Sequence, residues 1–471
     1  MAQTTTSSPR HLNRFTIFFF GALGGILFGY YLGIIAGVLP FVTELWDPSG
    51  WATGLLTASV AIGAVIGAIF SARTNQALGR RRTIQLAGLI ALVGSILTTI
   101  AGSMEQLTMF RLIIGIGVGL SSSTVPTYLS ELAPAKYRGA LGSLNQIFIV
   151  SGILIAFLTS YFLGESGNWR GMLAGAAIPA LLLVIGLSIL PDTPRWLLQR
   201  GDEEGARNVL LQAHGNDVDL DKEIAEIHTV IEIDQHRGRI RDLWTPWVRP
   251  MLFVALLLAI GQQFSGVNAI NAYFPTMMIS LGFATQAALL SGVLLGISKF
   301  VFTAAVIFVI DRWGRRPLAL LGNVLMAITL TGAGLVATQV DDRNTQGILM
   351  LVLIILYLVG YELGWGAVVW VMMSEVFPLR HRPAGMGVAT VALWASTGIV
   401  TAVFPLISAP DALGIGGSMF VFAGINVVLF GLTKWLVPET KGRSLEQIEL
   451  DLRARTGAST DPDHLASTRK D

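Results

Sequence analysis

The sequence contains no cysteine, which excludes disulfide bonds, thiol nucleophiles and thiolate metal sites. Charge is scarce as well, because charged residues make up only 13% of the 471 residues and the net charge is +2. A chain so close to neutral lacks the basic surplus of a nucleic-acid-binding protein. The six histidines lie outside the long apolar runs, and none has a metal-ligand spacing. We therefore expect neither nucleic acid nor a metal ion as a partner.

Motifs of enzymatic chemistry are also missing. The sequence shows no recognisable nucleophile motif, phosphate-binding loop or ATPase motif. The glycine-rich string GIGVG at 115–119 lies inside an apolar run without a preceding strand, so close helix packing explains it better than nucleotide binding. We predict that the protein is not an enzyme and needs no cofactor.

Hydrophobic residues make up 53% of the chain and gather in twelve apolar runs of roughly 20 residues or more. The runs fall near 14–41, 52–74, 83–103, 107–129, 139–163, 170–191, 250–280, 286–310, 317–338, 347–373, 383–408 and 415–437. Backbone polar groups in lipid must be paired within their own segment, so each run predicts a transmembrane helix. The fold class is therefore an all-α membrane protein. The first run is longer than a signal-peptide core, and we expect it to be retained.

Lysine and arginine alternate between the connecting segments. Those that follow even-numbered runs are Arg80, Arg81, Arg82, Lys136, Arg138, Arg312, Arg315, Arg316, Arg380 and Arg382. The opposite connections hold only Arg170 and Arg343. The positive-inside rule then places both termini in the cytoplasm. Short loops and the lack of an N-glycosylation sequon favour the plasma membrane of a bacterium, its inner membrane.

The two parts of the chain repeat each other. LGRRR at 78–82 is matched by WGRRP at 313–317, and SELAPAKYRG at 130–139 by SEVFPLRHRP at 374–383. Two echoes in the same order indicate parallel structural repeats with the substrate site between them, near the bilayer midplane. We expect two pseudo-symmetric six-helix halves. The predicted parts are a first half at 1–191, a cytoplasmic linker with short helices at 192–249, a second half at 250–437 and a cytoplasmic tail at 438–471.

Five strings at helix ends carry a family resemblance. They are ELAPAKYRG at 131–139, PDTPRW at 191–196, GQQFSGVNA at 261–269, DRWGRR at 311–316 and PETKGRSLEQIE at 438–449. From about residue 15 to 450 the chain resembles the sugar porter family of the major facilitator superfamily. The resemblance implies a membrane transporter of a sugar or polyol with two alternating conformations, which acts as a facilitator or as a proton symporter.

The charged strings at the cytoplasmic helix ends predict a gate. The expected pairs are Glu131 with Arg138, Glu375 with Arg382, and Asp311 with Arg315 and Arg316. Such pairs can bridge neighbouring helices when the inner side is closed, and a few kcal/mol is enough to shift two conformations of similar energy. The alternative is that these residues only fix the topology. Gln76 stands where the family has aspartate or asparagine, so we expect a weaker gate in the first half.

Amides on the seventh run are candidates for binding the substrate. Each sugar hydroxyl needs a donor or acceptor once it is desolvated, and Gln262, Gln263 and Asn268 supply both without charge. Their spacing would not aim all three at one point from an unbroken helix, so we expect a distortion near Ser265 and Gly266.

Two further residues join the candidate site by resemblance. Gln146 lies on the fifth run, and Trp370 on the tenth would offer an apolar face to a sugar ring. The alternative for the amides is interhelical hydrogen bonding, and for the tryptophan it is plain packing.

The resemblance breaks at the residue that couples transport to protons. Symporters of the family carry an aspartate at the position of Tyr31, paired with an arginine that matches Arg111. Tyrosine keeps its proton near neutral pH, so the usual proton site is absent and we expect facilitated diffusion. Arg111 then either extends its side chain outward to water or pairs with the phenol of Tyr31.

Lys299 is a second departure, because it stands where the family has a sugar-facing asparagine. Three roles remain open. Lys299 forms a structural pair with Glu362, or it recognises an anionic sugar acid, or the two residues form a replacement proton relay in a symporter. The partners expected are thus a sugar, polyol or sugar acid, protons in the coupled case, and membrane lipid. An alternative of another class, a nutrient-sensing receptor with the same fold, would need a larger cytoplasmic output than the short tail after Lys434.

Overall fold

The computed structural model describes residues 14–133, 138–214, 219–235, 240–378, 380–439 and 441. Within these ranges twelve helical segments are long and apolar enough to cross a membrane, and the secondary structure consists of helices and their connections. This confirms the all-α fold with twelve spans. Of the predicted tail at 438–471, residue 440 and residues 442–471 lie outside the described ranges.

The first six spans run from the N-terminal side of the chain to the linker. Their helices are α1 (Arg14–Trp46), α2 (Gly50–Leu78), α3 (Arg80–Thr99), α4 (Met104–Leu132), α5 (Arg138–Gly164), α6 (Trp169–Ala174) and α7 (Ala177–Ile189). The sixth span, predicted as one helix, is the pair α6 and α7 with a turn at Gly175 and Ala176. α1 also continues past the predicted end at 41 and stops at Trp46.

The last six spans repeat this arrangement with two interruptions. Their helices are α11 (Arg249–Phe264), α12 (Val267–Ser280), α13 (Thr285–Trp313), α14 (Arg315–Gln339), α15 (Arg343–Tyr361), the π-helix η3 (Glu362–Gly366), α16 (Ala367–Val376), α17 (Arg382–Ile407) and α18 (Gly414–Leu436). The seventh span is broken between α11 and α12, and the tenth contains η3. Irregular backbone at membrane depth occurs where it is buried in protein or lines a cavity.

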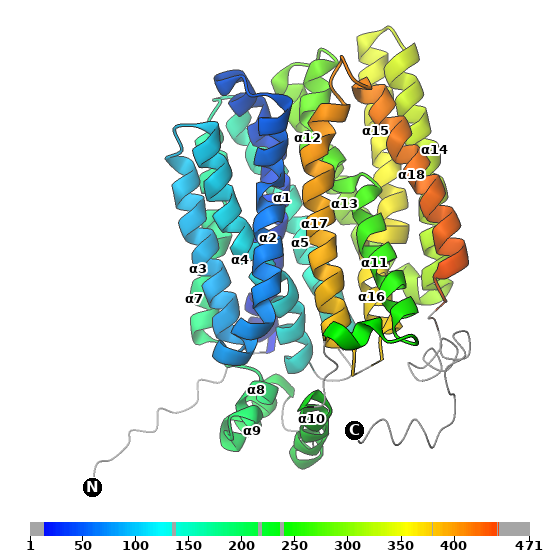
Figure 1. Cartoon of the computed structure of the whole chain (residues 1–471). Helices are drawn as coiled ribbons and strands as arrows, with labels where there is room; N and C mark the ends of the chain where they lie inside the picture. The colour runs from blue at the N-terminus through cyan, green and yellow to red at the C-terminus, as the bar shows by residue number, and fades with distance from the viewer. Residues whose placement is uncertain are drawn as a thin grey trace.

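The two sets of six spans stand side by side, with α1–α7 on one side and α11–α18 on the other (Figure 1). The linker forms α8 (Pro194–Gln199), α9 (Glu203–His214), α10 (Leu220–Gln235) and the short 3₁₀ helix η2 (Ile240–Trp244). Helices α8–α10 lie beyond one end of the bundle, which we call the linker end; the other is the far end (Figure 1). α2 and α17 pack against each other across the two halves.

Small residues let the helices of the first half approach closely. A Cβ atom on Gly115 would lie 2.2 Å from the carbonyl oxygen of Val60, and one on Gly119 would lie 2.2 Å from that of Ala64. Both distances are far below van der Waals contact. The GIGVG string therefore packs α4 against α2, as the sequence indicated.

Candidate functional site

The break in the seventh span organises the predicted amides into a chain. Gly266 has a φ of 102°, a left-handed conformation that glycine adopts without a Cβ penalty, and it separates α11 from α12. Asn268 Nδ2 donates to Gln263 Oε1 at 2.5 Å, and Gln263 Nε2 donates to Gln262 Oε1 at 3.0 Å. The expected distortion is present, and it brings the three amides into one hydrogen-bonded series. Gln262 and Gln263 are buried, whereas Asn268 is half-buried.

Gln262, at one end of this series of amides, binds the π-helix η3. Gln262 Nε2 donates to the carbonyl oxygens of Trp365 at 2.6 Å and Gly366 at 3.2 Å. A π-helix changes the backbone hydrogen-bond pattern, and such segments often mark functional sites. Gln262 therefore joins the seventh span to the tenth span. It hydrogen-bonds two spans to each other and also belongs to the candidate site.

Lys299 and Glu362 form the buried pair that was one of the three expectations. Lys299 Nζ on α13 lies 3.5 Å from Glu362 Oε1 on η3, and Thr303 Oγ1 donates to Glu362 Oε2 at 2.9 Å. The Lys299 ammonium also lies 5.3 Å from the centre of the Tyr361 ring. Both charges are thus held by neighbours inside the protein. Thr303, one turn beyond Lys299 on the same face of α13, went unnoticed in the sequence; its spacing of four residues was the available signal.

A small cavity lies between the two halves. Its volume is about 20 Å³, room for roughly one water molecule. The polar side chains that line it are Tyr31, Thr57, Arg111, Asn268, Thr397 and Thr401. The first three come from α1, α2 and α4, and the others from α12 and α17. Of the predicted binding residues, only Asn268 reaches this cavity.

Arg111 does not extend outward as one expectation held, and no hydrogen bond between described residues joins it to Tyr31, although both line the cavity. The Arg111 side chain is 1% exposed, so it does not extend to water. The hydroxyl of Tyr31 hydrogen-bonds Ser95 and donates to the carbonyl oxygen of Ala91 at 3.1 Å instead of accepting from the guanidinium. Arg111 Nε donates to Leu56 O at 3.3 Å, whereas Nη1 is buried without a hydrogen-bond acceptor. The phenol that the sequence suggested for Arg111 is thus hydrogen-bonded to α3.

The other two binding candidates lie away from the cavity. Gln146 is half-buried on α5, and Trp370 is half-buried on α16 and packs against the core. Among the described residues, no hydrogen bond joins Gln146 or Trp370 to the amide series. Their roles remain predictions from the resemblance.

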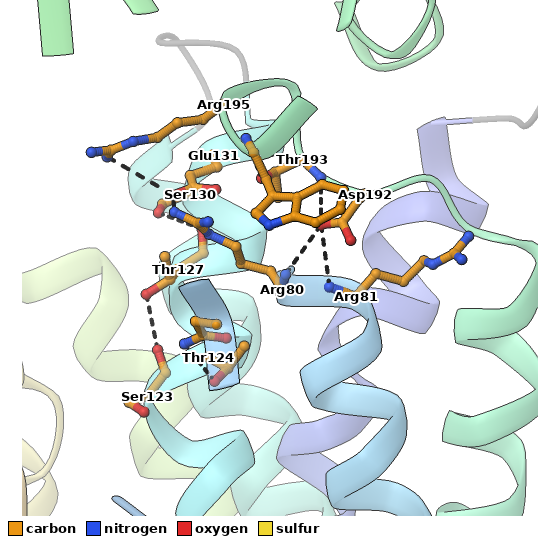
Figure 2. A network of polar contacts seen from close by, with 12 residues as sticks. Arg80, Arg81, Ser123, Thr124, Thr127, Ser130, Glu131, Asp192, Thr193 and Arg195 are labelled. Atoms are coloured by element: carbon orange, nitrogen blue, oxygen red, sulfur yellow. Dashed lines mark hydrogen bonds and ion pairs between the residues drawn. The ribbon is translucent and has the colours of Figure 1, made fainter. Parts of the chain in front are cut away.

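At the linker end, the first half holds a compact ionic network (Figure 2). Arg80 Nη2 lies 2.9 Å from Glu131 Oε1, and Arg195 Nη1 on α8 lies 3.9 Å from the same oxygen. Asp192 Oδ1 accepts from the backbone N–H groups of Arg80 at 3.1 Å and Arg81 at 3.4 Å, so it caps α3. Burial raises the pKa of Asp192, while these N–H donors and the charge of Arg81 oppose the shift.

The second half repeats this pattern. Glu439 accepts from the backbone N–H groups of Arg315 at 3.2 Å and Arg316 at 3.1 Å, so it caps α14 as Asp192 caps α3. Arg315 Nη2 lies 3.6 Å from Glu375 Oε1. Asp192 and Glu439 are not among the predicted gate residues, although the strings PDT and PET that contain them were the signal.

Of the predicted gate pairs, only Glu375 with Arg382 can be compared with the structure. The side chains of Arg138 and Asp311 lie outside the described part of the structure. Glu131 pairs with Arg80, and Glu375 with Arg315; between described residues no ion pair joins Glu375 to Arg382, whose Nη2 reaches the carbonyl oxygen of Phe377 at 3.5 Å. The helix ends bring arginines of the third and ninth spans beside these glutamates.

The expectation of a weaker gate in the first half stays a prediction, because the side chains of Arg138 and Asp311 lie outside the described part of the structure. The side chains of Arg80 and Glu131 are 7% and 9% exposed, whereas those of Arg315 and Glu375 are 15% and 26% exposed and farther apart. Arg80 reaches Glu131 directly from the start of α3, so Gln76 is not needed for this contact.

Contacts between the halves lie at the far end and in the middle of the bundle. Tyr273 Oη, which donates to Thr401 O of its own half at 3.0 Å, reaches Thr53 O of the first half at 3.5 Å, and Gln286 Nε2 donates to Tyr161 O across the halves at 3.0 Å. Trp394 Nε1 donates to Ser122 Oγ at 3.3 Å near mid-bundle. The ionic networks at the linker end, in contrast, each join helices of one half. Hydrogen bonds between described residues therefore connect the halves at the far end and at mid-bundle.

Comparison with known proteins places this architecture in a family. The model of the family described as sugar (and other) transporter matches residues 17–452. The glucose transporter GlcP of Staphylococcus epidermidis is 37% identical over 449 residues, covering 95% of this chain and 99% of the relative. The D-xylose transporter of Levilactobacillus brevis is 37% identical over 459 residues, covering 96% and 98%. The galactose-proton symporter of Escherichia coli K12 is 34% identical over 442 residues, covering 93% and 94%.

Solved structures agree with the sequence relatives. The inward open conformation of the xylose transporter XylE from E. coli superposes with a TM-score of 0.80 at 28% identity, covering 93% of this chain and 99% of that one. Its partially occluded inward open conformation gives a TM-score of 0.79 at 30% identity, covering 92% and 99%. The chain is thus a multi-pass membrane protein that belongs to the sugar porter family of the major facilitator superfamily.

Proposed function

We propose that the protein transports a neutral monosaccharide or polyol across the bacterial plasma membrane by alternating access, with both termini and the linker end in the cytoplasm. Family membership supports sugar transport, since relatives are named as transporters of glucose, xylose and galactose. The distribution of lysine and arginine supports the orientation. In this orientation the far end faces outward, and hydrogen bonds connect the two halves there and at mid-bundle.

One observation carries the proposal: Asn268 lines the cavity between the halves and begins the series of amides. Asn268 lies on α12 directly after the break, so its amide faces the cavity. Its other contact is the hydrogen bond to Gln263, which in turn donates to Gln262. Substrate hydroxyls could replace the amide–amide hydrogen bonds without leaving a buried charge. A site of this kind suits an uncharged polyhydroxy compound.

We further propose that Tyr31 does not couple transport to protons. Its hydroxyl is engaged with Ser95 and Ala91, and tyrosine keeps its proton near neutral pH. The pairing of Lys299 with Glu362 favours a structural role for this lysine over direct contact with a sugar acid. The second candidate function is proton symport through this pair, and the burial of Glu362, 1% exposed at mid-span, is the observation in its favour.

Transport by purified protein in proteoliposomes tests these proposals. Labelled hexoses, pentoses and inositol would be offered first, then the matching sugar acids, each with and without an imposed pH gradient. Uptake of a neutral compound that stops at equal concentrations, with no current, is expected for facilitated diffusion. Accumulation driven by the gradient and abolished in Glu362→Gln would instead establish symport through the pair, and uptake of none of these compounds would refute the assignment.

A further inference from the structure

Arg111 is a buried cation without an acid partner. It lies two turns into α4, is 1% exposed, and lines the cavity between the halves. A guanidinium stays protonated in proteins, so its charge cannot be removed by deprotonation. A single charge in this environment is costly unless it is paired.

The neighbours of Arg111 do not neutralise it. The ionisable side chains near it are the phenols of Tyr31 and Tyr273, which carry no charge near neutral pH. Both phenols already donate to backbone carbonyls, to Ala91 O and Thr401 O respectively. Among the described residues no carboxylate forms an ion pair with Arg111, and Glu362, the acid deep in a span, is paired with Lys299. The surplus positive charge of the bundle interior is therefore at Arg111 rather than at Lys299.

The cavity beside Arg111 is built for a small polar ligand. Nη1 is buried without an acceptor. Asn268 Nδ2 uses one of its two hydrogens on Gln263 and keeps the other for a ligand, whereas the hydroxyls of Thr57 and Thr397 donate to the carbonyl oxygens of Thr53 and Leu393. A volume of about 20 Å³ admits a water-sized ion.

We propose that Arg111 binds a small monovalent anion in this cavity, either a free halide such as chloride or the carboxylate of a bound sugar acid. Because Arg111 belongs to the first half and Asn268 to the second, the anion contacts both halves where the far end is closed. Its binding stabilises this conformation over one in which the halves separate there. The halide form of this inference is independent of the proposed function, whereas the sugar-acid form rests on it and extends the transported substrates to acids.

The test measures thermal unfolding of the purified full-length protein as chloride is replaced by a bulky organic sulfonate at constant ionic strength. We expect removal of chloride to lower the unfolding midpoint by about 2 °C or more, because a ligand that binds only the folded protein stabilises it. A second arm adds D-glucuronate or D-galacturonate to protein in sulfonate buffer. Bromide, located by its anomalous scattering in a crystal, gives the position of the ion directly.

Variants tie the response to Arg111. Arg111→Lys keeps the charge and should keep the response, whereas Arg111→Gln should abolish it. Tyr31→Asp supplies an internal carboxylate and should also abolish it, in a protein that retains its guanidinium. Arg73→Gln removes a charge from the exposed surface of α2 and should respond as the wild type does.

Each outcome decides the proposal. A chloride response that Arg111→Gln and Tyr31→Asp lose supports a free halide. Stabilisation by the sugar acids alone, lost in the same variants, supports a substrate carboxylate. A wild type indifferent to both, or an Arg111→Gln protein that responds normally, overturns the site. Neutral-sugar uptake is scored separately, so its failure would contradict the transport proposal while leaving an Arg111-dependent anion response standing.

Discussion

Lys299 Nζ lies 3.5 Å from Glu362 Oε1, and the two side chains are 8% and 1% exposed. The pair joins α13 to the π-helix η3, whose carbonyls at Trp365 and Gly366 bind Gln262. A path of direct contacts therefore leads from Asn268 at the cavity to the buried charges. A substrate that displaces the amides can therefore act on Lys299 and Glu362 through the backbone of η3.

Removing one charge of this pair should destabilise the protein more than removing both. Glu362→Gln or Lys299→Met alone leaves a buried charge uncompensated, at a cost of about 3–5 kcal/mol. The double variant should recover much of this loss, since neither charge then remains. Thermal unfolding of the four proteins in detergent measures the coupling. If the two single losses simply added in the double variant, the residues would not be acting as a pair.

Asn268→Ala should weaken substrate binding more than it weakens folding. Loss of the amide leaves a substrate hydroxyl and Gln263 Oε1 without a partner, which costs about 1–3 kcal/mol, or roughly 5- to 150-fold in affinity. Titration of the sugar identified by uptake, followed by tryptophan fluorescence, measures the change. Asn168→Ala is the control, because this exposed asparagine caps α6 and its loss should affect stability but not affinity. Unchanged affinity in Asn268→Ala would remove the residue from the site.

Gly266→Ala should impair both folding and binding. A Cβ at φ 102° is strained by about 1–2 kcal/mol, and it would meet the Phe422 ring at 2.8 Å. Relief of the strain by straightening the seventh span would turn Asn268 away from the cavity. Gly424→Ala provides the comparison, because nothing lies within 4 Å of its Cβ and alanine favours a helix. Equal thermal stability and uptake in the two variants would show that the break is dispensable.

Asp192 should give the linker end a distinctive pH dependence. Burial raises its pKa, so the folded state binds this proton more tightly than the unfolded state does. The contribution of this group to stability is therefore largest below the ordinary aspartate value of 3.8 and declines as the pH rises through the raised value.

Asp192→Asn isolates this effect, because its amide oxygen can still accept from the backbone of Arg80 and Arg81. We expect the unfolding midpoint of the wild type to improve relative to this variant as the pH is lowered from 7 toward 4. A difference that stays constant over this range would mean that the carboxyl group does not titrate there. Asp192→Ala, which removes the cap, should be less stable than Asp192→Asn at each pH.

Several features of the site were predictable because they depend on short stretches of sequence. The break near Gly266 followed from the density of small residues around the amides, and the structure shows it between α11 and α12. Lys299 and Glu362 stood out as charges in apolar runs, which made their pairing one of a few possibilities. Asp192 and Glu439 were not among the predicted gate residues because each acts on a helix N-terminus that is distant in sequence.

Sequence by itself determined the twelve spans and the two-fold repeat, because hydropathy over about 20 residues and the recurrence of GRR turns are local properties. Only the tertiary structure decided which charges meet. Glu131 of the fourth span meets Arg80 of the third and Arg195 of the linker, and Tyr31 turns to α3, while no described acid forms an ion pair with Arg111. The direction of a side chain depends on the rotation and depth of its helix within the bundle, and packing against distant segments sets both.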